Sequence, residues 1–229
     1  METFADKIIA FNRKLDLVLD IPDIEVMNPF HEPKVLDFTE QFYRRFFNDQ
    51  NKRIFIFGIN PGRHGAGITG ISFTDPIRLE TKCRIINHLP KNPELSSEFI
   101  YKMIDGYGTV QDFYSRFFIT AVSPLGFLTH GKNLNYYDTK DLQEKTRPFI
   151  VQSIKDQIEF GAFSECAICV GGDKNFRFLN NLNDEYSLFD RIFALEHPRF
   201  IMQYRRKMIN DFISKYLTVM NQCLELTVK

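Results

Sequence analysis

The sequence predicts an α/β protein in which helices cover both faces of a central four-stranded parallel sheet. Four short runs of apolar, mainly β-branched or aromatic residues stand apart along the chain, at residues 54–57, 117–122, 167–170 and 192–195. Runs of this kind are typical of strands that are buried on both faces. Segments with helical periodicity separate them, and an alternation of strands and helices indicates a parallel sheet.

The helices are expected before, between and after these strands. Apolar periodicity, capping residues and proline breaks define their limits. The expected helices cover residues 4–19, 35–47, 74–116 with a break near 90–93, a segment from the capping Thr139 to Phe160, a segment from about Asp173, and 203–224.

The length of 229 residues is suited to one domain with a full hydrophobic core. No repeat, linker or low-complexity segment divides the chain. We therefore expect a single three-layer domain over residues 1–229, with residues 1–34 as an N-terminal helical extension packed on it.

The charge of the chain is balanced, with 29 basic and 29 acidic side chains. Binding to nucleic acid would therefore need a local basic patch. No apolar run approaches the length of a membrane span, and the charged first residues do not form a signal peptide. We expect a cytoplasmic monomer that does not bind membranes.

Four cysteines are too few and too scattered for a disulfide framework. Cys166 and Cys169 form a C-x-x-C pair, which is compatible with metal or redox chemistry. They lie in an expected buried strand, however, where residues three apart point to opposite faces. Small core side chains are the favoured interpretation, and we expect neither a metal nor a cofactor.

The stretch of residues 58–73 directly follows the first expected strand and is rich in glycine and proline. This composition forbids a helix and lets the backbone approach a ligand closely. Open α/β sheets bind ligands at the carboxyl ends of their strands. Asn60 and Phe73 lie in this stretch, and His197 follows the last strand, so Asn60 and His197 are expected at one edge of the sheet.

Two phosphate-binding motifs fail in this stretch. Gly65 to Gly70 matches G-x-G-x-x-G, but Gly65 stands seven positions after the strand ends and no helix starts at Gly70. A Walker loop would need Gly-Lys-Ser/Thr, and Gly67 is followed by Ile68 and Thr69 instead.

The stretch resembles the first motif of the uracil-DNA glycosylase superfamily, most closely in its single-strand-selective monofunctional branch and a bacterial subgroup of that branch. The matching segments are Gly58-Ile-Asn60-Pro61-Gly62 and Thr69-Gly70-Ile-Ser-Phe73, with Val122-Ser-Pro124-Leu125 at the middle strand and His197-Pro198 as the second motif. The resemblance implies an α/β/α fold of that family and hydrolysis of a base from DNA to leave an abasic site.

The resemblance also implies the roles of individual residues. Asn60 would hold the attacking water, and His197 would donate a hydrogen bond to the departing base. Phe73 would stack on the extrahelical base. The other residues expected to contact the substrate are Gly58, Ile59, Pro61, Gly62, Thr120 and Ser123. Simpler interpretations remain open, namely a turn at Asn60, an ordinary strand-end histidine, and a core phenylalanine.

Two departures from the family pattern affect the substrate. The family reads uracil with an asparagine near the end of the middle strand, where this chain has Thr120 and Ala121. A hydroxyl or backbone amide would read the base here, so xanthine and hypoxanthine join uracil as expected substrates. The second motif continues as Arg199 and Phe200, which would form a wedge in the loop after His197.

Contacts with DNA are expected from Arg63, Pro198, Arg199, Phe200, Arg205 and Arg206. A basic run such as residues 205–207 is also compatible with a solvated helix face. The DNA would be single-stranded, with double-stranded DNA left open. Two alternatives are a nucleic-acid or nucleobase-binding module that does not catalyse, and a hydrolase of free nucleosides.

Overall fold

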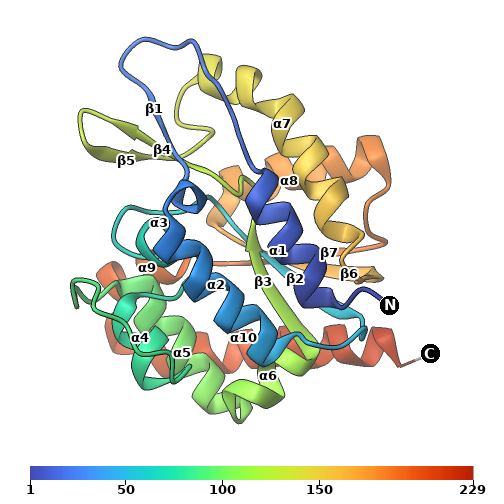
Figure 1. The fold of residues 1–229 in the computed structure, drawn as a ribbon. Coiled ribbons are helices and arrows are strands. Elements are labelled where there is room, and N and C mark those ends of the chain that lie inside the picture. Colours follow the sequence, from blue (N-terminus) through green and yellow to red (C-terminus); the bar gives the residue numbers. More distant parts are fainter. Residues whose placement is uncertain (229) are drawn as a thin grey trace.

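The computed structural model describes residues 1–228. It has three layers, with helices on each side of a parallel sheet (Figure 1). The strand order in this sheet is β3-β2-β6-β7, and all three pairings are parallel. The strands are β2 (Arg53–Gly58), β3 (Phe117–Ala121), β6 (Ala162–Val170) and β7 (Ile192–Leu195). The predicted fold class is confirmed.

The helices divide between the two faces of the sheet. Helices α7 and α8 cover one face, and α5, α6 and α10 cover the other (Figure 1). The helical elements are α1 (Phe4–Lys14), η1 (Pro29–His31), α2 (Pro33–Phe46), α3 (Ala66–Thr69), α4 (Pro76–Thr81), α5 (Leu95–Tyr107), α6 (Val110–Arg116), α7 (Lys140–Ile158), α8 (Gly172–Tyr186), α9 (Pro198–Tyr204), η2 (Arg206–Met208) and α10 (Ile209–Thr227).

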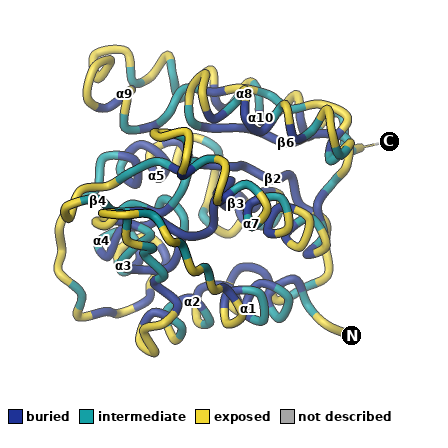
Figure 2. Tube along the Cα trace, turned by 90° about the horizontal axis from the view of Figure 1, so that it is seen from above, coloured by how far each residue is buried: buried dark blue, intermediate teal, exposed yellow. Residues whose placement is uncertain are grey.

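Three of the four predicted apolar runs are buried, but β7, at the edge of the sheet, is only partly buried and exposes Ala194. Every residue of β2 and β3 is buried, and Figure 2 shows these two strands in dark blue among helices whose outer turns are yellow. Cys166 and Cys169 of β6 are 0% and 1% exposed, in agreement with a core role. Burial on both faces stabilises the sheet and fixes the positions of the strand ends.

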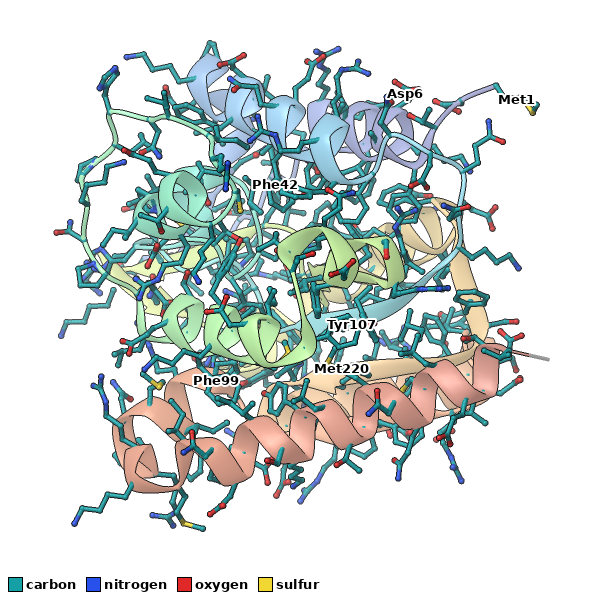
Figure 3. All side chains as sticks on the ribbon, turned by 90° about the horizontal axis from the view of Figure 1, so that it is seen from below. Met1, Asp6, Phe42, Phe99, Tyr107 and Met220 are labelled. Atoms are coloured by element: carbon teal, nitrogen blue, oxygen red, sulfur yellow. The ribbon has the colours of Figure 1, made fainter. Side chains whose placement is uncertain are left out.

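Helix α1 begins at a capping box formed by Thr3 and Asp6. Its residues Phe4, Ala5 and Ile8 are at most 1% exposed, so the first helix belongs to the main core. On the opposite side, Phe99 of α5 and Met220 of α10 (Figure 3) are also buried in that core. In the described residues 1–228, no helix is long and apolar enough to cross a membrane.

A second, antiparallel sheet was not predicted. It consists of β1 (Glu25–Met27), β4 (Gly126–Thr129) and β5 (Lys132–Leu134), in the order β1-β4-β5. Strands β4 and β5 form a hairpin that lies near α3, close to the carboxyl ends of the central strands (Figure 1). The strands are too short and too exposed to give an alternating pattern in the sequence.

Several expected helix limits are wrong. The first helix ends at Lys14 and not at residue 19, because the backbone at Leu15 is extended. The expected closing helix is split into α9, η2 and α10. The glycine-rich stretch contains a single helical turn, α3, which ends at Gly70 with φ +72°, a conformation that glycine adopts without strain.

Candidate active site

A cavity of about 400 Å³ opens at the carboxyl edge of the central sheet. Its wall combines the ends of β2 and β3, Gly171 after β6, and the beginning of α9. This is the edge at which open α/β sheets bind ligands. The residues expected from the sequence that line it are Gly58, Ile59, Asn60, Pro61, Gly62, Phe73, Thr120, His197, Arg199 and Phe200.

The side chain of Asn60 is held by main-chain groups of the last residue of β5 and of the segment that follows it. Its Nδ2 donates to the carbonyl of Leu134 at 3.2 Å, and its Oδ1 accepts from the amide of Tyr136 at 3.2 Å. One partner can only accept and the other can only donate, so the orientation of the amide is determined. The remaining lone pair of Oδ1 is available to one further donor.

His197 is the N-cap of α9, and Pro198 occupies the first position of that helix. Its Nδ1 accepts a hydrogen bond from the main-chain amide of Arg199 at 3.1 Å. Burial, and secondly the charge of Arg199, lower the pKa of His197 to about 4. The ring is therefore neutral at pH 7. Because Nδ1 accepts, the single proton resides on Nε2, which makes Nε2 a donor.

Phe73 lies against the end of β2, where no side chain larger than hydrogen fits at Gly58. A Cβ added to Gly58 would lie 2.9 Å from Cε2 of Phe73. Phe73 adopts φ +51°, an unusual conformation for a non-glycine residue. Its ring centroid lies 5.8 Å from that of His197 at an interplanar angle of 56°. The aromatic wall and the imidazole therefore border the same space.

Thr120 and Ser123 are placed differently, although both were expected to contact the base. Thr120 lines the cavity, and its hydroxyl donates to Oε1 of Gln157 on α7. Ser123 is 0% exposed and donates its hydroxyl to the carbonyl of Leu125 at 2.8 Å. Thr120 therefore lines the cavity as expected. Ser123 does not, because its hydroxyl is directed at the β3–β4 connection.

The segment after His197 is a helix, so the expected loop conformation is wrong, and the role of Arg199 and Phe200 as a wedge stays a prediction. Arg199 and Phe200 lie in the first turn of α9. The guanidinium of Arg199 is 3.6 Å from the carboxylate of Glu94, at the start of α5. Phe200 is 41% exposed and points its ring toward Tyr204, with centroids 5.6 Å apart. Pro198 is buried beneath this turn.

The other three expected DNA contacts, Arg63, Arg205 and Arg206, do not line the cavity, although their chain neighbours Gly62, His64 and Tyr204 do. Arg63 donates to the carbonyl of Gly131 in the β4–β5 turn. The guanidinium of Arg205 lies over the ring of Phe200 at 5.6 Å. Arg206 pairs with Glu98 at 3.2 Å, and its side chain is 61% exposed. All three arginines are exposed, on the glycine-rich loop or directly after α9.

A family model described as the Uracil DNA glycosylase superfamily matches residues 45–221. The chain belongs to this superfamily. The crystal structure of wild-type SMUG2 from Pedobacter heparinus is similar to this structure, with a TM-score of 0.95 and 42% sequence identity. The match covers 98% of this chain and 100% of that chain. No curated protein sequence matches the chain.

The resemblance to the single-strand-selective monofunctional branch is thereby confirmed. Membership in the superfamily makes the chain a DNA glycosylase, a hydrolase that acts on N-glycosyl bonds in DNA repair.

Several cavity residues of this glycosylase were not expected from its sequence. Asn133, Asn135 and Tyr137 reach the cavity from β5 and the segment that follows it. Burial raises the pKa of Tyr137 to about 12, so its hydroxyl keeps its proton at neutral pH. Finding these residues would have required the second sheet. Among residues 1–228, no group of three or more His, Cys, Asp or Glu side chains is placed to hold a metal ion.

Proposed function

We propose that this protein is a monofunctional glycosylase that hydrolyses the N-glycosidic bond of uracil in DNA and leaves an abasic site. Xanthine and hypoxanthine are further substrates of the same site. The observation that carries the proposal is one cavity in which Asn60 has an oriented, partly free acceptor and His197 has an oriented donor.

Asn60 would position the attacking water. Its Oδ1 has one lone pair left after accepting from Tyr136, and a water molecule can donate to it. The bond between C1′ and the base breaks, and its electron pair leaves with the base. The oxygen of the water then bonds to C1′ of the cationic sugar. The proton that the water releases neutralises the departing base, so the reaction consumes one water and no cofactor.

His197 would stabilise the base as it leaves. Negative charge develops on a carbonyl oxygen of the base, and a donor held ready at that oxygen lowers the barrier. The hydrogen bond between Nδ1 and the Arg199 amide keeps the proton on Nε2. A neutral imidazole acts here as a hydrogen-bond donor and does not have to lose its proton.

Phe73 and the end of β2 would hold the base in the cavity. A base that leaves the DNA stack loses its stacking energy, and an aromatic face restores part of it. The absence of a side chain at Gly58 lets the ring of Phe73 lie close to the strand. Main-chain groups of Ile59, Pro61 and Gly62 complete this wall.

The protein would act as a monomer on single-stranded DNA, and more slowly on paired DNA. Arg63, Arg205 and Arg206 would contact phosphates near the mouth of the cavity. The first turn of α9 carries Arg199 and Phe200 at the mouth, where they could fill the gap left by a flipped nucleotide. Phosphate would compete with Glu94 for Arg199.

The experiment uses oligonucleotides with one uracil, xanthine or hypoxanthine, either single-stranded or paired. Protein from a host without uracil glycosylases is incubated with a tenfold excess of substrate, and alkali-labile sites and free base are measured. We expect free base in excess over enzyme. Stoichiometric binding without release of base would refute the proposal and favour a non-catalytic binding module. A double variant, Asn60→Ala with His197→Asn, is the control for contaminating enzymes.

A further inference from the structure

A second, much smaller cavity lies behind the base-binding cavity. It has a volume of about 30 Å³, which is enough for at least one water molecule. Thr120 and Ala121 at the end of β3 line both cavities, as do Pro61, Ala66 and Ser72. The end of β3 is therefore part of the wall between the space for the base and a space large enough for water.

Two buried amides line the small cavity, Asn12 of α1 and Gln157 of α7. Asn12 is 5% exposed and Gln157 is 1% exposed. Within residues 1–228, neither Nδ2 of Asn12 nor Nε2 of Gln157 has a hydrogen-bond partner of good geometry. The hydroxyl of Tyr43, which lines the same cavity, lies close enough to the Asn12 amide to affect the pKa of Tyr43, so the Gln157 amide is the one with no neighbour of this kind. Buried N–H groups without partners are rare in folded proteins and are commonly satisfied by an internal water.

The oxygen of the Gln157 amide contacts Thr120, which lines the base-binding cavity. This oxygen, Oε1, accepts a hydrogen bond from the Thr120 hydroxyl. A hydroxyl has one proton and two lone pairs. Once that proton is directed at Gln157, the oxygen of Thr120 has only lone pairs to offer at the wall of the base-binding cavity.

We propose that the hydrogen bond to Gln157 leaves Thr120 able only to accept, so that Thr120 accepts a hydrogen bond from a ring N–H of the base. One water molecule is bound between Gln157 and Asn12. Gln157 is then a positioning residue that determines specificity, and Thr120 is the group that reads the base. The inference rests on the proposed glycosylase function.

This arrangement favours uracil and hypoxanthine over their parent bases, cytosine and adenine, for a chemical reason. Uracil has an N–H at ring position 3, and xanthine and hypoxanthine have one at position 1. Cytosine and adenine have a bare nitrogen acceptor at the corresponding positions. A freely rotating hydroxyl can donate or accept and would bind either class. A hydroxyl fixed as an acceptor leaves the bare nitrogen of cytosine or adenine unpaired, which disfavours these two bases. Thymine and guanine carry a ring N–H at the same positions, so this contact does not distinguish them from uracil and xanthine.

The buried water can be tested without any assay of activity. A crystal structure of the wild-type protein at about 1.5 Å or better should show one ordered water within hydrogen-bond distance of Nδ2 of Asn12 and Nε2 of Gln157. The amide of Gln157 should keep Oε1 toward Thr120. A dry cavity, or an Nε2 that donates to Thr120, would overturn the inference even if the enzyme is active.

The effect on specificity is tested with uracil and 3-deazauracil, in which a C–H replaces the ring N–H. Gln157→Met should lower the single-turnover rate on uracil about tenfold and on 3-deazauracil by less than about twofold. In a Thr120→Val background, Gln157→Met should have no further effect on the ratio of the two rates. Gln157→Glu keeps an acceptor oxygen and should preserve the ratio.

Gln152→Met is the matched control, because Gln152 lies on the same helix and is exposed. Equal losses on both substrates with Gln157→Met would mean that Gln157 only supports the fold, and the inference would be wrong. If Gln157→Met does not fold, the ratio measured with Gln157→Glu and the crystal structure decide. Failure of wild-type protein to release uracil would instead refute the proposed function.

Discussion

The substitution His197→Asn should separate two tasks that one imidazole ring performs. Asparagine is a good N-cap, and its Oδ1 can accept from the Arg199 amide as Nδ1 does now. It has no donor where Nε2–H stands. We therefore expect a folded protein whose barrier to base release rises by about 2.7–4 kcal/mol, the effect of removing one preorganised donor. Single-turnover rates on single-stranded uracil DNA measure this loss.

The same substitution should change how stability depends on pH. The pKa of His197 is about 4 in the folded protein and 6.5 in the unfolded chain. The unfolded chain therefore binds a proton first as the pH falls. The stability associated with a neutral His197 is fully present above about pH 6.5 and is lost as the pH falls from 6.5 to 4. Between pH 7 and pH 5 this loss is about 2 kcal/mol.

Urea unfolding at pH 7 and pH 5 measures this difference. The free energy of unfolding of the wild type should fall by about 2 kcal/mol more than that of His197→Asn. The wild-type rate of base release should stay flat from pH 8 to about pH 5, because the ring is neutral throughout. A rate that halves near pH 6.5, or one that rises as His197 gains its proton, would refute the assignment of a neutral donor.

Four further outcomes are expected. Asn60→Ala should stay folded and raise the barrier by about 2.7–4 kcal/mol in single-turnover assays, and an unchanged rate would remove Asn60 from the mechanism. Gly58→Ala should slow base release, because its Cβ would lie 2.9 Å from the ring of Phe73; normal kinetics would show that the ring has no role. Truncating Arg199 and Phe200 together to alanine should slow excision from paired DNA far more than from single strands, and equal losses would contradict a role in base flipping. The affinity for single-stranded DNA should fall with salt with a log–log slope of roughly −2 to −4, for about three to five neutralised phosphates, and a flat response would argue against DNA as the ligand.

The central sheet could be predicted because burial on both faces leaves a strong signal in the sequence. A continuous apolar run such as residues 54–57 has few alternatives to a buried strand. Parallel strands bring their carboxyl ends together, so Asn60 and His197 could be assigned to one edge before any coordinates were known. The cavity that they share agrees with that assignment.

The antiparallel sheet and helix α9 could not be predicted in the same way. Strands β4 and β5 have four and three residues, too few for a periodic pattern. For α9 a signal existed, because a capping residue followed by proline is a common helix start. The second motif of the family led us to expect a loop after His197 in spite of that helix signal. The role of Gln157 has no local signal, because its partner Thr120 stands 37 positions away in the chain.

The way in which Asn60 is held suggests what selection can and cannot change in this enzyme. Its partners are the carbonyl of Leu134 and the amide of Tyr136, which are main-chain groups and exist whatever side chains those positions carry. These two hydrogen bonds do not depend on the side chains at positions 134 and 136, as long as position 136 is not proline. One residue inserted or deleted between Leu134 and Tyr136 would, in contrast, move the carbonyl or the amide away from Asn60. Among homologues of this glycosylase, gaps between these two positions should be rarer than substitutions at them.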